Sequence, residues 1–187
     1  MFKFAALCVS LPAMAVLPII IAPDARLKVT SEPVGQVDGG VRALLDDMLE
    51  TMHAAPGVGL SAVQVGVPRR LIVVDVARHG EPPAPLFLAD PEIVRSSDET
   101  VTMEEGCLSF PEHYAEVLRP AAVTIRYLDR DDRRQELDLE ALLARCVQHE
   151  MDHLDGILLV DHLSAIKRGI ILRKLVKARK AKALKIA

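Results

Sequence analysis

The chain has 187 residues, a length typical of one globular domain with its own buried core. Half of the residues are apolar, 26% are charged and 3% are aromatic, with no Trp. This composition is typical of a globular enzyme and argues against a protein that stacks nucleic-acid bases on aromatic side chains.

The net charge of −3 is unevenly distributed along the chain. Residues 162–187 contain nine Lys or Arg and no Asp or Glu. Residues 1–161 hold the other 14 basic and all 26 acidic side chains, a net charge of −12. A basic tail on an acidic body suggests a polyanionic partner for the tail, and a basic helix face that contacts only solvent is the alternative.

An apolar run at residues 4–22 follows Lys3 near the N-terminus. Pro12 and Pro18 interrupt this run, which argues against a membrane-spanning helix. Three interpretations remain: a secretory signal cleaved after Ala13-Met14-Ala15, a buried strand region, or an upstream extension before a natural start at Met14.

The first predicted elements are a helix and a strand. Apolar residues recur every three or four positions from Val41 to Met52, which predicts an amphipathic helix that starts after Asp38 and ends at Pro56-Gly57. A glycine-rich stretch then leads to residues 70–77, whose β-branched side chains predict a buried strand.

The remaining elements alternate between short strands and helices. Two short strands are predicted at 86–89 and 93–94, followed by strands at 123–128 and 136–139 around a charged hairpin tip. Helical spacing predicts a helix at 140–154 and a final helix from about Leu163. The mixed order predicts an α+β fold in one domain.

The sequence His149-Glu150-Met151-Asp152-His153 is an H-E-x-x-H motif within the helix predicted at 140–154. The two imidazoles lie one turn apart on one helix face, where both can bind one divalent cation. The Glu150 carboxylate between them is free to carry protons beside the metal. A pair of ordinary histidines is the alternative for a motif this short.

Cys107, in Glu104-Glu105-Gly106-Cys107-Leu108-Ser109, is the candidate third ligand, as a thiolate. It lies outside any periodic apolar stripe, whereas Cys146 lies within one and is typical of a core cysteine. A Cys/His/His set leaves a fourth position for water, as a catalytic site requires.

Residues 57–64, Gly-Val-Gly-Leu-Ser-Ala-Val-Gln, form a third candidate element. Its glycines allow the backbone to come close to a ligand, and the Gln64 amide can donate a hydrogen bond to a developing oxyanion. A turn with a surface Gln is the alternative for this segment alone.

The motifs G-V-G-L-S-A-V-Q, E-G-C-L-S and Q-H-E-M-D-H-L-D-G resemble, in this order and spacing, those of peptide deformylase, from about Met14 to Lys180. The resemblance implies an enzyme that removes the N-formyl group from the initiator methionine of nascent proteins and releases formate. It implies small antiparallel or mixed sheets around a central metal-binding helix, with an N-terminal strand and turn within residues 15–27. It also implies a catalytic domain at 14–187 and favours an upstream extension at 1–13.

The resemblance assigns roles to individual residues. It makes Cys107, His149 and His153 the metal ligands and Glu150 the general base and acid. Gln64 and the backbone N–H of Leu108 would form the oxyanion site. The residues implied to line a methionine pocket, together with His149, are Val58, Gly59, Leu142 and Cys146.

Other positions are structural or depart from the family pattern. Arg119 and Asp152 resemble a structural ion pair behind the ligand helix. Ser61 stands where the family commonly has Ala, and Arg145 at a pocket position that is often apolar. Tyr114 stands where many relatives carry a basic residue near the substrate.

The residue chemistry and the family resemblance together lead to expectations for the cofactor and the partners. A Cys/His/His set favours Zn²⁺ by its chemistry, whereas the resemblance implies Fe²⁺, with Zn²⁺, Ni²⁺ or Co²⁺ as substitutes, and we expect Fe²⁺. The expected partners are N-formylmethionyl nascent peptides and the ribosome, bound through the basic helix at 163–187. Three cysteines without disulfide spacing favour a reducing compartment, so we expect a cytoplasmic protein. We also expect a monomer that binds neither DNA nor membranes. Removing residues 165–187 should weaken ribosome binding and leave turnover of a short peptide nearly unchanged.

Two rival functions remain open. A zinc endopeptidase shares H-E-x-x-H but usually takes its third ligand downstream, whereas Cys107 lies upstream. A ribosome-docking factor without catalysis would fit the basic tail.

Overall fold

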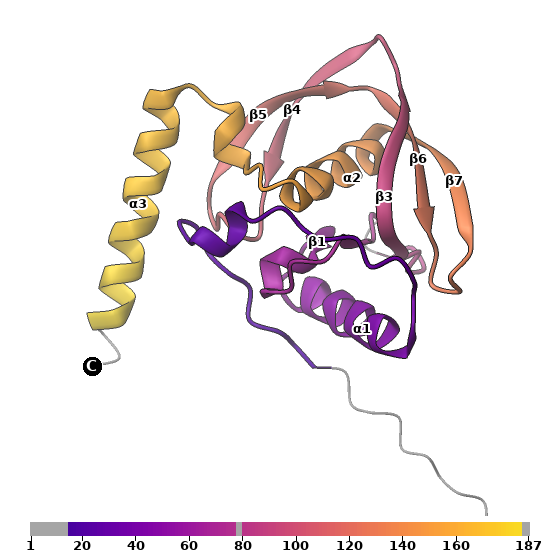
Figure 1. The fold of residues 1–187 in the computed structure, drawn as a ribbon. Helices are drawn as coiled ribbons and strands as arrows, with labels where there is room; N and C mark the ends of the chain where they lie inside the picture. The colour runs from indigo at the N-terminus through magenta and orange to yellow at the C-terminus, as the bar shows by residue number, and fades with distance from the viewer. Residues whose placement is uncertain (1–14, 78–79, 185–187) are drawn as a thin grey trace, which may run out of the picture.

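The computed structural model describes residues 15–77 and 80–184 (Figure 1). The expectations for residues 1–13, including an upstream extension and Cys8, lie outside the described residues. The strands are β1 (Gly59–Ser61), β2 (Leu71–Val74), β3 (Leu86–Ser96), β4 (Thr100–Gly106), β5 (Tyr114–Pro120), β6 (Ala122–Leu128) and β7 (Arg134–Glu140). The helices are α1 (Gly39–Ala54), α2 (Ala141–Leu154) and α3 (Ala165–Leu184), with short 3₁₀ helices η1 (Ala25–Lys28), η2 (Ala62–Val65) and η3 (Leu159–His162).

An antiparallel five-stranded sheet, in the order β1-β2-β3-β6-β7, lies between α1 and α2. On one face of β2, Ile72 and Val74 belong to the core cluster that contains side chains of α2. On the other face, Leu71 and Val73 belong to the cluster that contains side chains of α1. Because both faces of β2 are covered, the strand is apolar throughout, as the sequence predicts, although it is shorter than residues 70–77.

Strand β3 corrects the sequence prediction, which was two short strands on either side of Asp90-Pro91. The chain forms one strand whose pairing with β6 shifts register between Ala89 and Glu92. Asp90 has φ +49°, and its carboxylate accepts hydrogen bonds of 2.8 Å from the backbone N–H groups of Val34 and Gly35. A bulge thus accommodates the proline without ending the strand.

The hairpin of β4 and β5 was not predicted from the sequence. Along β5, Ala115, Val117 and Arg119 are buried and alternate with exposed residues. The pattern was missed because its third inward position holds a charged Arg119, which finds its partners only in the folded chain. The hairpin forms the second, two-stranded sheet, and Cys107 follows directly after β4.

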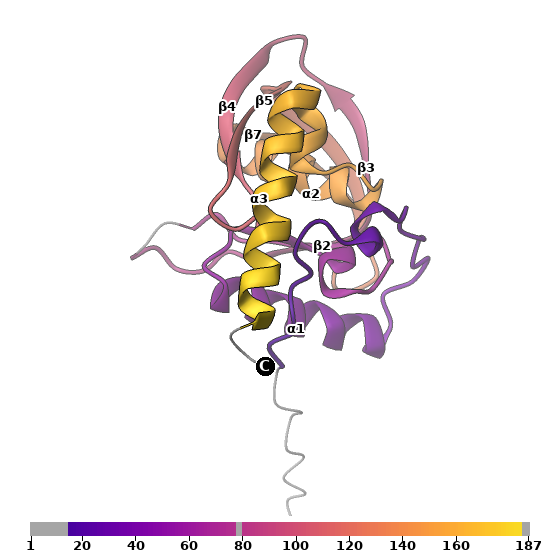
Figure 2. The ribbon, with the colours of Figure 1, turned by 90° about the vertical axis from the view of Figure 1, so that its left-hand side faces the viewer.

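Helix α2 lies between the five-stranded sheet and the β4–β5 hairpin, as Figure 1 shows, and carries the H-E-x-x-H motif. Its position confirms the predicted α+β fold with sheets around a central helix. Helix α3 packs on one side of this body (Figures 1 and 2), with the buried side chain of Leu175 in a cluster with Ile20 and Phe110. In the described part of the chain, no helix is both long and apolar enough to span a membrane.

The N-terminal strand implied by the family resemblance is not formed. Residues 15–21 have no regular secondary structure, and η1 supplies the expected turn. The segment is held instead by single hydrogen bonds: Ile20 N–H donates to Gln64 O at 2.8 Å, and Ala22 N–H donates to Ser109 O at 2.9 Å. It therefore runs past two of the segments that build the site.

Candidate metal centre

Three side chains from two segments place their ligand atoms together. One ligand atom each of Cys107, His149 and His153 lies within 4.8 Å of the other two. The Sγ of Cys107 is 3.1 Å from Nε2 of His153. His149 Nε2 is buried and has no hydrogen-bond partner among the described residues. A sulfur and two imidazole nitrogens so placed, one of them otherwise unpartnered, fit a divalent transition-metal ion.

The imidazole of His149 is oriented from behind by a carboxylate. Its Nδ1 lies 2.9 Å from Oε2 of Glu105, a residue of the β4 strand to which sequence reasoning gave no role. This contact turns Nε2 toward Cys107 and His153, as in metal sites whose histidines hydrogen-bond to a carboxylate. The position of Glu105 two residues before Cys107 was the available signal.

Arg119 holds this carboxylate and the ligand helix together. Its guanidinium contacts both Glu105 oxygens, at 2.7 and 3.0 Å, and Asp152 Oδ2 at 2.9 Å. The predicted pair of Arg119 and Asp152 is therefore confirmed, with Glu105 as a third member. Burial raises the pKa of Glu105, but hydrogen bonds from His149 and Arg119 outweigh it and lower the pKa to about 2. Glu105 is therefore ionised at neutral pH.

Burial also shifts the pKa values of His153 and Glu150. Burial lowers the pKa of His153 well below its usual range. His153 is therefore neutral, the form that ligates metals. Burial raises the pKa of Glu150, whose side chain accepts a hydrogen bond from Ser61. A raised carboxyl pKa suits a group that must both take and give a proton.

Two hydrogen-bond donors lie near Cys107, one from Gln64 and one from the neighbouring Leu108. The Gln64 amide is buried; its Nε2 is 3.1 Å from Ser109 Oγ and 3.7 Å from Cys107 Sγ. Its oxygen accepts from the Ser61 N–H at 2.8 Å, which fixes which end of the amide faces the cysteine. The N–H of Leu108 makes no hydrogen bond within the described part of the chain. Two donors therefore lie close to Cys107.

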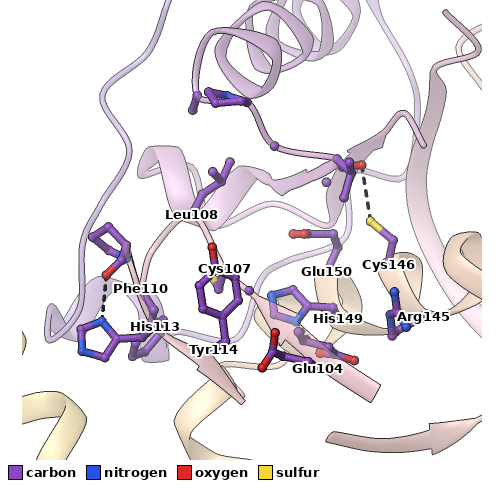
Figure 3. A pocket seen from close by; sticks show the side chains of 18 of the residues that line it. Glu104, Cys107, Leu108, Phe110, His113, Tyr114, Arg145, Cys146, His149 and Glu150 are labelled. Carbon is purple, nitrogen blue, oxygen red and sulfur yellow. Dashed lines mark hydrogen bonds and ion pairs between the residues drawn. The ribbon is translucent and has the colours of Figure 1, made fainter. Parts of the chain in front are cut away.

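A cleft of roughly 480 Å³ opens beside these groups, and Figure 3 shows Cys107, His149 and Glu150 together in it. Among the residues that line it are the four expected in a methionine pocket: Val58, Gly59, Leu142 and Cys146. Val58 and Leu142 are exposed at 46% and 41%, so apolar surface is available to a ligand.

Two of the three departures from the family pattern, Arg145 and Tyr114, line this cleft. The Arg145 guanidinium contacts the Met103 sulfur, and its side chain stands beside Cys146 in Figure 3. Tyr114 is 64% exposed and its ring covers Gly106, where an added Cβ would lie 3.0 Å from the ring. A guanidinium and an exposed aromatic ring therefore line the same cleft as the apolar side chains of Val58 and Leu142.

Comparison with known proteins identifies the family. The sequence matches the polypeptide deformylase family model over residues 16–169. It is 51% identical over 172 residues to a peptide deformylase from Rhizobium meliloti, covering 92% of this chain and 99% of that protein. The chain belongs to the polypeptide deformylase family.

Solved structures agree with this assignment. A peptide deformylase from Ehrlichia chaffeensis in complex with actinonin matches with a TM-score of 0.85 and 42% identity, over 88% of this chain and 98% of that chain. A Met-Ala-Ser-bound class I type b peptide deformylase from Acinetobacter baumannii matches with a TM-score of 0.75 and 34% identity, over 80% and 99%.

The activity follows from the family. The protein is a hydrolase that removes the N-formyl group from the N-terminal methionine of newly synthesised proteins, with release of formate. The described site contains a group of residues able to bind the metal on which such an enzyme depends. Both rival functions, an endopeptidase and an inactive docking factor, are thereby set aside.

Proposed function

We propose that Cys107, His149 and His153 hold one Fe²⁺ ion and that deformylation takes place at this ion. The observation that carries the proposal is the meeting of the three ligand atoms within 4.8 Å, with a buried His149 nitrogen otherwise unpartnered. Fe²⁺ is proposed on the family resemblance, and Zn²⁺, Ni²⁺ or Co²⁺ would fit the same donors. A divalent ion bound there supplies Lewis acidity, which activates water at neutral pH and polarises the formyl carbonyl.

Glu150 is the proton carrier in this proposal. Its carboxylate is buried beside the candidate ligands and is not one of them. It accepts a proton from the attacking water and later gives that proton to the departing amine of methionine. Burial raises its pKa toward the pH at which it works, which supports both halves of this role.

Gln64 and the N–H of Leu108 stabilise the oxyanion. The Gln64 Nε2 faces Cys107, and the Leu108 N–H is the next donor along the chain from that cysteine. As the formyl oxygen gains negative charge, both donors can bind it. In well-studied enzymes, one such donor lowers the activation barrier by about 3 kcal/mol.

Val58, Gly59, Leu142 and Cys146 bind the methionine side chain in the proposal. All four line the cleft, and a relative of known structure binds Met-Ala-Ser, a peptide that begins with methionine. Burial of this side chain contributes about 1.5–3 kcal/mol. The absence of a side chain at Gly59 leaves a narrow passage that accepts a formyl hydrogen and excludes larger acyl groups.

Helix α3 docks the enzyme on the ribosome in the proposal. Lys174, Lys177 and Lys180 are exposed on it, and its basic charge suits a phosphate surface. Residues 14–187 form one catalytic domain in this proposal, and the enzyme acts as a monomer in the cytoplasm, where nascent chains emerge.

A formate-release assay with formyl-Met-Ala-Ser, run anaerobically beside metal analysis, tests the catalytic proposal. Wild-type protein with about one Fe²⁺ per chain should release formate and leave internal peptide bonds intact. Cys107→Ser should lower both the metal content and formate release, because the hydroxyl is a poorer ligand than the thiolate. Unchanged metal stoichiometry and turnover in Cys107→Ser would refute the assignment of the ligands.

A further inference from the structure

Ser61 connects the two groups to which the proposed reaction assigns proton transfer and oxyanion binding. It is the last residue of β1 and is fully buried. Its backbone N–H donates to the Gln64 side-chain oxygen at 2.8 Å. Its hydroxyl lies 2.7 Å from Oε2 of Glu150, a residue 89 positions further along the chain. A single serine thus contacts Gln64 through its backbone and Glu150 through its side chain.

The two oxygens of the Glu150 carboxylate have different surroundings. Oε2 is bonded to the Ser61 hydroxyl, whereas Oε1 faces Gly59. A Cβ built on Gly59 would lie 2.6 Å from Oε1. Because Gly59 and Glu150 both line the cleft, the unanchored oxygen lies on the side of the carboxylate where substrate binds.

We infer that Ser61 is a positioning residue for deformylation: its hydroxyl anchors one oxygen of Glu150 so that the other is presented to the cleft beside Gly59. The inference rests on the proposed role of Glu150. A glutamate has three side-chain torsions, and a fixed hydrogen bond selects one of the available orientations before substrate arrives. Proton transfer requires hydrogen-bond geometry at the reacting atom. The contact between Ser61 and Glu150 should therefore affect the rate of proton transfer by Glu150.

The anchor does not require a particular charge on Glu150. A hydroxyl both donates and accepts, and the Ser61 oxygen is also 2.8 Å from the backbone oxygen of Glu150. Ser61 can donate to the carboxylate, or accept from the carboxylic acid while it donates to that backbone oxygen. The contact can therefore persist while Glu150 gains and loses the transferred proton.

Ser61→Ala tests the inference because it removes the hydroxyl and keeps the backbone contact to Gln64. We expect kcat for formyl-Met-Ala-Ser to fall about tenfold, the effect of losing one hydrogen bond to an ionisable group. KM, metal stoichiometry and the urea midpoint should change little. Ser61→Thr, which restores the hydroxyl, should recover most of the loss. Ser31→Ala is the matched control, because Ser31 is buried and its hydroxyl has no partner among the described residues.

A double-mutant cycle with Glu150→Asp separates positioning from a general packing effect. The shorter aspartate cannot keep both the contact with Ser61 and its reach into the cleft, so adding Ser61→Ala should then change kcat less than twofold. An unchanged kcat in Ser61→Ala alone, an effect on KM or metal content instead, or an equal loss in both backgrounds would overturn the inference. Failure of the Glu150 role itself is recognised separately, by near-normal turnover of Glu150→Gln.

Discussion

At the candidate metal centre, Glu150 is a buried carboxylate that is not among the three candidate ligands. Glu150→Gln keeps the size of the side chain and removes its ability to carry a proton. We expect formate release to fall by about 100-fold or more, because general acid–base catalysis commonly contributes that much. Metal content, measured anaerobically on the same sample, should stay at the wild-type level. Near-normal turnover would contradict the assigned role.

Gly59 is the residue at which added volume should harm the site most directly. A Cβ there would lie 2.6 Å from Glu150 Oε1 and 2.7 Å from Cys146 Sγ, closer than side-chain carbons come to other atoms. Gly59→Ala must therefore displace the carboxylate, and we expect kcat/KM to fall at least about tenfold, as overpacking of a close-packed site implies. Gly39→Ala is the control, because its Cβ would meet nothing within 4 Å. Equal kcat/KM in the two variants would contradict the close approach at Gly59.

At the scale of elements, α3 is part of the core as well as a carrier of charge. Leu175 is buried and packs in the same cluster as Phe110 and Cys107. Removal of residues 165–187, expected from the sequence to leave turnover of a short peptide nearly unchanged, would therefore open the core beside a candidate metal ligand. A test of docking has to keep this helix.

Leu175→Ala measures this contribution. We expect the free energy of unfolding to fall by about 2–4 kcal/mol, because the substitution leaves a cavity in a packed cluster. Ile166→Ala, at a position of the same helix that is 77% exposed, should change it by less than about 0.5 kcal/mol. Urea unfolding of both variants provides the measurement, and similar losses would show that α3 is not anchored through Leu175.

Asp161 ties η3 to two neighbouring elements. It pairs with Lys28 of η1 and with Arg168 of α3 at 3.4 Å, and it accepts the Leu158 N–H at 2.8 Å. Burial raises its pKa, but the hydrogen bonds from Lys28 and Leu158 outweigh burial and lower it. Its contribution to stability is therefore present above the unfolded pKa of about 3.9 and is lost as the pH falls through the folded value.

Asp161→Asn should lower the free energy of unfolding at pH 7 by about 1 kcal/mol, since the group is partly exposed and its ion pairs are screened. The difference from wild type should shrink when both proteins are unfolded with urea at pH 3. A difference that is the same at both pH values would show that the charge of Asp161 is not involved.

At the scale of the whole molecule, charge is separated between an acidic body and a basic helix. Reversal of Lys174, Lys177 and Lys180 to Glu should weaken ribosome binding at least about tenfold at low salt, because each lost phosphate contact reduces both affinity and salt dependence. Turnover of formyl-Met-Ala-Ser should stay within about twofold. Co-sedimentation with ribosomes at several salt concentrations measures the first effect.

The matched control reverses three exposed arginines outside α3, Arg69, Arg133 and Arg134. It changes the net charge equally, so an equal loss of ribosome binding would point to overall charge and not to α3.

Local patterns explain which parts of the fold could be predicted. Helix α1 follows from the apolar spacing after Asp38, whose side chain accepts the Val41 N–H at 2.8 Å. The sequence predicted two strands in place of β3 because Asp90-Pro91 is typical of a strand end. In the structure, hydrogen bonds from a distant segment stabilise a bulge at this point. The β4–β5 hairpin was missed because Arg119 interrupts its apolar alternation, and its partners lie elsewhere in the chain.

The sequence by itself determined the chemistry of the centre and the pairing of His149 with His153, because a spacing of four residues places both on one helix face. Only the tertiary structure decided how Cys107 meets them and how Glu105, 44 residues before His149, orients that imidazole. It alone brings Ser61 to Glu150. The physical reason is that a helical repeat is encoded in neighbouring residues, whereas contacts between distant segments form when the hairpin and β1 pack against α2.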